Sequence, residues 1–384
     1  MSFLVQLCVT DRCNLGCPYC YVPNRRRDLT KDMVLQAMER IKGFMKATGE
    51  STYNVSYFGG EPLLRMDLIK ELAPMFYADP KCDFQSIVSN GTLLTQENYD
   101  YLKQYMGFSW SFDGIGSETS RPLLQMEENK GYKSIIDVYK DKRDLILEAS
   151  GYGCKCMIYP GNAGNMVENF KYMVDFGVKY VDFAIVRDDI WKKEDIEVFR
   201  KECARLREYL EGEFKKGNVY GCGFLDLMID QSVQALLFGR HRYSCFAGTT
   251  GCAVSADGKI FGCQRFAQAD ALEYPDDYNF TEMRNILEPY AHEECKNCDI
   301  SLVCKTGCQF SQIKNHNRVL PAVCELYHIL YSEGFKLCHN LRDCETFQMW
   351  RYEQAKDMLD RNQNVHKETP KYNEKIKADM ERQR

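Results

Sequence analysis

Cysteine is the residue that most constrains this sequence of 384 residues, because it occurs 19 times and in two groups. One group lies near the start, at Cys13, Cys17 and Cys20, and a larger group begins at Cys245. The apolar stretch Phe3–Val9 is too short for a signal peptide and has no basic leader, so we expect a cytoplasmic protein. Clustered cysteines in that reducing compartment indicate metal or redox chemistry rather than disulfides.

The charge balance argues against two kinds of partner. Lys and Arg number 50 against 55 Asp and Glu, a net charge of −5, and Arg25–Arg27 is the longest basic run, so we expect no nucleic-acid partner. The apolar runs are far shorter than a membrane span, so we expect no membrane partner. A hydrophobic content of 45% is enough to bury the core of one large domain or two.

Short β-like runs alternate with helical patterns up to about residue 217. The runs are rich in Val, Ile, Phe and Tyr and end in Gly, Asn, Asp or Pro. Lys31–Met45 and Asp195–Phe214 each have an apolar stripe at helical spacing, and Cys203 in the second stripe is predicted to be a buried thiol. The predicted strands are Phe3–Thr10, Tyr53–Gly59, Asp83–Asn90, Phe108–Asp113, Cys154–Pro160 and Tyr180–Arg187.

Six successive strand–helix units predict an α/β fold with a parallel sheet and helices outside. Eight units would close a barrel, so six predict a partial, TIM-like (β/α)6 barrel. The alternation stops near residue 235, and the charged tail after residue 344 lacks cysteine. We therefore expect a core domain at 1–235, a small cysteine-rich domain at 236–344 and a helical or mobile tail at 345–384. In the tail we expect one helical face made of Trp350, Tyr352, Ala355 and Met358.

The first cysteine group reads Cys13-Asn-Leu-Gly-Cys17-Pro-Tyr-Cys20 and follows the first predicted strand. Iron–sulfur clusters are held by cysteine thiolates, usually four of them, and this run supplies three with no fourth nearby. A [4Fe–4S] cluster on three ligands leaves one iron open for a small molecule. Zinc is the alternative metal, although a zinc site would favour two close pairs of cysteines.

This C-x3-C-x2-C run, with Tyr19 before its last cysteine, resembles the signature of the radical S-adenosylmethionine (SAM) family. Three further segments resemble motifs of that family: Gly59–Pro62 its GGEP, Ser89–Thr92 its (T/S)NGT and Ser111–Gly114 its SxDG. Each segment follows a predicted strand, and parallel barrels carry their chemistry on the loops at the carboxyl ends of their strands.

The resemblance implies that Cys13, Cys17 and Cys20 hold a [4Fe–4S] cluster with SAM at its open iron. It places the Tyr19 region against adenine and the SAM ammonium group at the GGEP segment, where Glu61 can accept its hydrogen bonds. Side-chain amides and hydroxyls can bind the ribose or the SAM carboxylate. The predicted SAM-binding residues are Tyr19, Gly59, Gly60, Glu61, Asn90 and Ser111.

The later cysteines resemble the SPASM domain, an appendage of many radical SAM enzymes that carries two auxiliary [4Fe–4S] clusters. Its C-x2-C-x5-C-x3-C core matches residues 295–308, and Gly258-x4-Cys263 precedes it. The resemblance implies the ligands Cys245, Cys252, Cys263 and Cys308 for auxiliary cluster I and Cys295, Cys298, Cys304 and Cys324 for auxiliary cluster II. Full ligation would suit electron transfer better than substrate binding. A zinc site on the C-x2-C-x5-C-x3-C run is the alternative, which would leave the other four cysteines without a role.

The resemblance covers about residues 3–340 and implies a radical SAM oxidoreductase. An external donor such as flavodoxin or ferredoxin would supply the electron that splits SAM into methionine and a 5′-deoxyadenosyl radical, which takes a hydrogen atom from the substrate. The auxiliary clusters would then accept an electron. Our first hypothesis is a maturase that forms a crosslink, a thioether or a similar product on a peptide or protein. The sequence assigns no general base, so the catalytic residues stay unknown.

Several alternatives stay open. Gln264 stands where sulfatase-maturating relatives have an Asp base, which disfavours formylglycine formation unless another base serves. The chain begins at the first predicted strand, so we expect a separate partner or an exposed sheet edge to bind any leader peptide. Cys222, between two glycines, is a candidate for the substrate pocket, and Arg187 either faces that pocket or forms a surface salt bridge. A small-molecule radical SAM dehydrogenase is the enzymatic alternative, and an iron–sulfur electron carrier or sensor the non-enzymatic one.

Overall fold

The computed structural model describes most of the chain. The described residues are 2–23, 25–223, 245–248, 250–274, 295, 297–301, 304, 308–316 and 318–364. The expected domain boundary at residue 235 and the last part of the expected tail lie outside these residues. No helix among the described residues is long and apolar enough to cross a membrane.

Parallel strands form the centre of the fold, as predicted. The first four lie side by side in chain order, and the next three form a second sheet. A bridge between Ser111 and Lys155 joins the two sheets. The parallel strands are β1 (Phe3–Cys8), β2 (Tyr53–Phe58), β3 (Cys82–Ser89), β4 (Gly107–Trp110), β5 (Gly153–Ile158), β6 (Tyr180–Ile185) and β7 (Gly221–Cys222). All six predicted strands are thereby confirmed.

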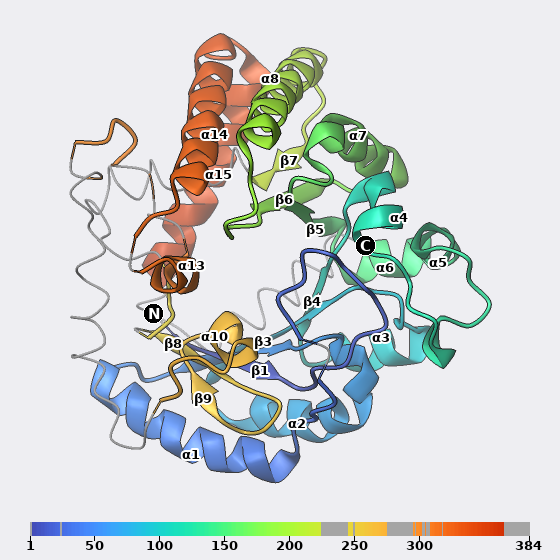
Figure 1. Ribbon diagram of the computed structural model, residues 1–384, viewed down its shortest axis with the longest axis vertical. Coiled ribbons are helices and arrows are strands. Elements are labelled where there is room, and N and C mark those ends of the chain that lie inside the picture. Colours follow the sequence, from blue (N-terminus) through green and yellow to red (C-terminus); the bar gives the residue numbers. More distant parts are fainter. Residues whose placement is uncertain are drawn as a thin grey trace.

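Helices line the outer side of the arc of strands (Figure 1). They are α1 (Lys31–Thr48), α2 (Met66–Ala78), α3 (Gln96–Leu102), α4 (Ser117–Ser120), α5 (Ile135–Asp141), α6 (Arg143–Ala149), α7 (Met166–Phe176) and α8 (Lys193–Lys215). In α1 the Thr30 side chain accepts a hydrogen bond from the Met33 amide, and Gly49 ends the helix at φ 77°. Val34 and Ile41 on one face of α1 are fully buried, so the predicted amphipathic helix is confirmed.

A hairpin from the cysteine-rich region extends the first sheet. β8 (Gly251–Val254) pairs in parallel with the open side of β1, and β9 (Ile260–Phe261) pairs antiparallel with β8. The short helices α10 (Gln264–Gln268) and α13 (Gln309–Lys314) follow. Among the described strands, β7 and β9 form the outer ends and no ladder joins them, which fits a partial barrel. The sequence did not predict that this region shares the barrel sheet.

Two long helices, α14 (Pro321–Asn340) and α15 (Glu345–Asn364), follow the cysteine-rich region. α14 lies beside α8 (Figure 1), and Arg207 of α8 donates to Glu333 of α14 at 2.8 Å. Cys203 on α8 is buried, as predicted. In α15, Trp350 packs against Phe214, but Tyr352 is 66% exposed. Residues two apart point to different sides of a helix, so the expected shared face was wrong.

Candidate iron–sulfur and S-adenosylmethionine site

The loop after β1 brings Cys13, Cys17 and Cys20 together. The Leu15 amide donates to Cys13 Sγ and the Val22 amide to Cys20 Sγ, each at 3.4 Å. Burial raises the pKa of Cys13 to about 12, and the nearby Cys17 and Cys20 thiols add to that rise. Burial also raises the pKa of Cys17 to about 11. Three thiols that repel one another as thiolates, with amide donors beside two of them, are suited to hold a metal cluster.

The segment Gly59–Glu61 holds this loop through its backbone. The Gly60 amide donates to the Thr10 carbonyl at 2.7 Å, and the Glu61 amide donates to the Arg12 carbonyl at 2.8 Å. A Cβ atom on Gly59 or Gly60 would lie 2.2 or 2.1 Å from those carbonyl oxygens. Paired glycines are therefore required here because two backbone segments approach closely.

The Glu61 carboxylate lies fully inside the protein and is bonded to the loop after β3. It accepts hydrogen bonds from the Leu63 amide at 2.9 Å, the Ser89 hydroxyl at 2.7 Å and the Asn90 amide at 2.8 Å. Burial raises the pKa of Glu61 to about 7 despite these donors. Three of roughly four acceptor positions are thus used within the protein. A direct bond from Glu61 to the SAM ammonium group stays a prediction.

Asn90 belongs to a buried polar network that sequence reasoning missed. Its Nδ2 donates to Asn14 Oδ1 at 2.9 Å and lies 3.9 Å from Cys13 Sγ, while its Oδ1 accepts from the Thr92 amide. Asn14 Nδ2 donates in turn to Asn129 Oδ1 at 2.8 Å. The network therefore positions the cysteine loop. The predicted role of Asn90 in binding SAM is not tested by these contacts.

Tyr19 joins the cysteine loop to a buried ion pair. Its hydroxyl donates to Asp113 Oδ2 at 2.8 Å, and its ring lies against Tyr159 and 5.6 Å from the Arg121 guanidinium. Arg121 Nη2 donates to Asp113 Oδ1 at 3.0 Å, and both side chains are buried. Arg121 also opposes the rise in the pKa of Cys17. Within this pair, the Arg121 guanidinium is the positive charge beside the cysteine loop.

Ser111, the last predicted SAM contact, is half-buried just after β4. Its amide donates to the Ser89 carbonyl at 2.9 Å, and its own carbonyl accepts from the Tyr139 hydroxyl at 3.2 Å. Its hydroxyl has no hydrogen bond to a described residue and so has capacity to bind a ligand.

Three later cysteines meet on the inner face of the first sheet. Burial raises the pKa of Cys263 to about 12, and Cys245 and Cys308 add to the rise. Cys308 lies under Arg265, whose Nη1 is 3.3 Å from its Sγ. Burial acts to raise the pKa of Cys308, but Arg265 and other neighbours outweigh it and the pKa is lowered. Arg265 therefore favours the thiolate form of Cys308, the form that an iron cluster needs.

The fourth residue expected in that set, Cys252, lies elsewhere. It is the second residue of β8 and pairs with Val5, and both side chains lie in the large core beneath the helices. Its neighbour Ala253 belongs to the small core on the other face, together with Cys263. Successive side chains of a strand point to opposite faces, so the structure does not bring Cys252 to Cys263.

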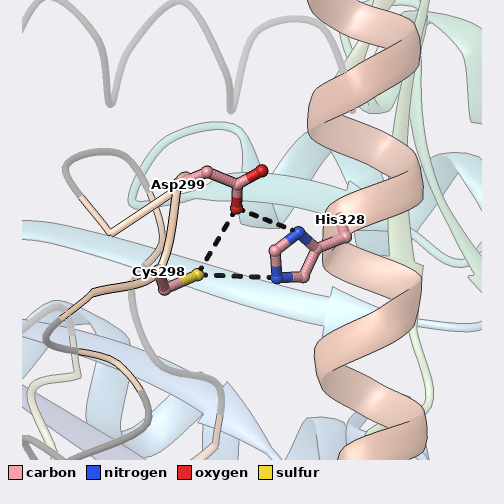
Figure 2. A group of neighbouring side chains, drawn as sticks. All are labelled: Cys298, Asp299 and His328. Atoms are coloured by element: carbon pink, nitrogen blue, oxygen red, sulfur yellow. Dashed lines mark hydrogen bonds and ion pairs between the residues drawn. The ribbon is translucent and has the colours of Figure 1, made fainter.

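In the second predicted auxiliary set, Cys298 contacts a histidine that sequence reasoning did not use. Figure 2 shows the His328 ring of α14 facing both Cys298 and Asp299, which also contact each other. His328 Nε2 lies 3.5 Å from Cys298 Sγ, and Nδ1 lies 3.3 Å from Asp299 Oδ1. Cys324 is one turn before His328 on α14, and this i, i+4 spacing was the available signal. Cys304 contributes to the raised pKa of Tyr327 on the same helix, and Cys295 is half-buried.

Cys222 and Arg187 are two further candidates from the sequence, and the structure describes the burial of the first and the contacts of the second. Cys222 is fully buried in the core on β7, so the expectation that it lines a substrate pocket was wrong. Arg187 forms no ion pair with a described residue. Its guanidinium lies 5.8 Å from the Tyr327 ring, and Cys308 and Cys245 contribute to its raised pKa.

Tyr21 lies between the two cysteine groups. Burial raises its pKa, and Cys8, Cys20 and Cys263 add to the rise. Its side chain is nevertheless 41% exposed, and the Arg265 guanidinium is 5.5 Å from its ring. Tyr21 therefore lies near one cysteine of each group, Cys20 of the first and Cys263 of the second.

A partial parallel barrel with three cysteines in the loop after its first strand defines a class of iron–sulfur proteins that bind a ligand at the barrel mouth. Residues 7–145 match the family model of the Radical SAM superfamily. The chain therefore carries a radical SAM domain, which implies a [4Fe–4S] cluster, and it is a radical SAM enzyme. The three thiols and their amide donors fit that cluster chemically.

Known proteins resemble the chain over most of its length. It is 20% identical over 364 residues to the cysteine-type anaerobic sulfatase-maturating enzyme of Clostridium perfringens strain ATCC 13124, covering 84% of this chain and 93% of that protein. The structure of histidine-tagged anSMEcpe with bound AdoMet is 17% identical with a TM-score of 0.67, covering 92% and 99%. Streptococcus suis SuiB bound to precursor peptide SuiA is 18% identical with a TM-score of 0.52, covering 82% and 73%. The two structural likenesses show a shared fold.

Proposed function

We propose that the chain uses SAM cleavage to modify a peptide or protein oxidatively, forming a crosslink, a thioether or a similar product. The observation that carries this proposal is the second cysteine group, which Tyr21 connects to the first through its proximity to Cys20 and Cys263. A protein that only split SAM would need one cluster. A second redox group beside it suits a reaction that must remove an electron from the product as well. Relatives named for a maturation reaction or solved with a peptide support the substrate class.

The proposed first cluster is held by Cys13, Cys17 and Cys20, and when bound it supplies the electron that splits SAM. The chain's own residues do the rest: Gly59 and Gly60 set the loop, and Arg121 provides charge beside it. Proposed SAM contacts are Tyr19, Gly59, Gly60, Glu61, Asn90 and Ser111. Two auxiliary clusters, in a segment at about 236–344, would accept the product electron, and a flavodoxin or ferredoxin would act as donor. A separate leader-binding protein is part of the proposal.

Formylglycine formation is the second candidate, because the alignment with the sulfatase-maturating relative covers 93% of that protein. The side-chain amide of Gln264 cannot act as a base. Gln264 lies at the start of α10, and its backbone N–H donates to Gln6 Oε1 at 3.1 Å. Asp188 is a carboxylate near the same site, but it is bound to Arg265 at 2.5 Å. Neither Gln264 nor Asp188 is therefore a free base for this reaction.

The test uses anaerobically reconstituted protein with SAM and dithionite. We expect 5′-deoxyadenosine from the wild type and none from Cys17→Ala, while Cys338→Ala, a matched change on α14, keeps the activity. A candidate peptide encoded beside the gene should lose two hydrogen atoms for each crosslink or thioether. A sulfatase peptide converted to formylglycine would instead support the second candidate. Clusters without any SAM cleavage would contradict both and indicate an electron carrier or sensor.

A further inference from the structure

Cys252 is fixed on the outer face of the sheet by its strand pairing. In β8, Cys252 pairs with Val5 and Ala253 pairs with Gln6. Paired residues of neighbouring strands share a face, so Cys252 shares the face of Val5, which is covered by the helices. Its exposed fraction is 0%, and Val254, two residues on, lies in the same core.

The three other cysteines of the predicted set lie on the opposite side of the sheet from Cys252. Cys263 belongs to the small core that holds Ala253, and Cys245 packs against that core. Cys308 Sγ lies 3.3 Å from Nη1 of Arg265, which follows Cys263 by two residues. Strand parity and packing therefore give the same division of the set.

Cys252 cannot be brought to the inner face by a small movement. A slip of one residue in the β1–β8 register would turn every side chain of β8 over. Val254 would leave the core along with Cys252, and Ala253 would leave the small core that holds Cys263. The hydrophobic burial of the whole strand opposes this change.

We propose that auxiliary cluster I is bound by Cys245, Cys263 and Cys308 without Cys252, so that one of its iron atoms takes a ligand that is not a cysteine of this set. This inference rests on the proposed function, since it requires that an auxiliary cluster is present. Cys252 is then a core residue that packs as a small apolar side chain.

The surroundings of the three cysteines select the class of ligand for the remaining iron. Arg265 Nη1 lies 3.3 Å from Cys308 Sγ, and Arg187 acts on Cys308 and Cys245. Asp188 neutralises much of the Arg265 charge at 2.5 Å, whereas Arg187 has no ion pair with a described residue, so its guanidinium favours an anion over a cationic ligand. The position therefore suits a small anion or an anionic group of the substrate, and auxiliary cluster I is a binding site as well as an electron acceptor.

The test uses the full chain with Cys13, Cys17 and Cys20 changed to Ala, so that only auxiliary clusters assemble. Anaerobic reconstitution should give about eight irons in two clusters, and Mössbauer spectra should show about one of them without thiolate ligation. Cys252→Ala should leave both results unchanged, whereas Cys263→Ala should remove about half of the iron. Cys252→Val keeps an apolar side chain in the core and repeats the first comparison if Ala impairs folding. Cyanide, an anionic probe, should shift the EPR spectrum of the reduced cluster.

Loss of half of the iron from both Cys252→Ala and Cys252→Val would overturn the proposal, provided that Cys154→Ala, a change of another buried strand cysteine, keeps its iron. The same loss of iron from Cys8→Ala would make Cys8 the fourth ligand and overturn the proposal that this ligand is not a cysteine. An EPR spectrum that cyanide leaves unchanged would also overturn it. A background protein that holds no iron would contradict the auxiliary clusters themselves, which is a different result from a loss confined to the Cys252 variants.

Discussion

The Tyr19 hydroxyl donates a 2.8 Å hydrogen bond to Asp113 Oδ2, which ties the cysteine loop to the segment after β4. Asp113 also accepts from Ser120 at 2.6 Å and from the Met157 amide at 2.9 Å. One buried carboxylate thus connects the cysteine loop with β5 and with the segment that precedes Arg121. Because these segments are distant in sequence, the loop geometry depends on the tertiary fold and not on the cysteine motif alone.

Arg121→Met should destabilise the metal-free protein. The change leaves the Asp113 carboxylate buried without its ion-pair partner, and breaking a buried pair costs about 3–5 kcal/mol of unfolding free energy. Urea denaturation measures the loss. Arg200→Met removes an exposed pair with Glu325 and should cost less than about 1 kcal/mol. Equal losses from the two variants would show that the buried pair has no special weight.

Gly60→Ala should disturb the cysteine loop, because the new Cβ would lie 2.1 Å from the Arg12 carbonyl oxygen. We expect a loss of about 1–3 kcal/mol, typical of overpacking, and less iron bound at the first cluster. Gly43→Ala is the matched control, since it lies within α1 with nothing within 4 Å of the new Cβ. The control should gain up to about 1 kcal/mol in stability. Normal iron binding by Gly60→Ala would contradict the proposed backbone contact.

Glu61 should make the stability of the metal-free protein depend on pH. Its pKa is about 7 in the folded chain against an ordinary value of 4.5, so the folded state holds the proton more tightly. The resulting stability is fully present below pH 4.5 and is lost as the pH rises through about 7, a change of up to about 3 kcal/mol. Glu61→Gln should abolish this part of the slope, and the exposed Glu128→Gln should not. Identical slopes in all three proteins would refute the buried-acid interpretation.

His328→Leu should lower the reduction potential of auxiliary cluster II. An imidazole N–H at His328 Nε2 can donate to the Cys298 thiolate, and hydrogen bonds to cluster sulfurs raise the potential. A bond worth about 1 kcal/mol corresponds to roughly 40 mV for one electron. EPR-monitored redox titration measures the shift. His339→Leu, an exposed change on the same helix, should leave the potential unchanged, and a similar shift in both variants would exclude a specific effect of His328.

The sequence predicted the six barrel strands because each contains Val, Ile, Phe or Tyr, ends at or just before Gly, Asn, Asp or Pro, and alternates with a helical pattern. It did not predict β8, because Gly251–Val254 lies outside that alternation and its partner β1 lies almost 250 positions earlier. The ligand set containing Cys252 failed for a related reason. Cysteine spacing records the distance along the chain, whereas the parity of a strand decides which face a thiol reaches.

The site shows the same division between local and tertiary information. The cysteine loop and the Gly59–Glu61 segment are visible in the sequence because their roles need particular residue types at fixed spacing. Asn14 and Asn129 carry no such pattern, and only the fold brings them together at 2.8 Å. Arg265 likewise reaches Cys308 across 43 positions of sequence.

The pairing of β8 with β1 has a consequence for the order in which the protein can be built. β1 leaves the ribosome long before its second neighbour, which follows only after residue 254 has been made. Until then β1 presents an unpaired edge of a kind that recruits other chains. Truncation before Gly251 would make that exposure permanent, so residues 1–250 produced alone should aggregate, because β8 is the strand that covers this edge of β1.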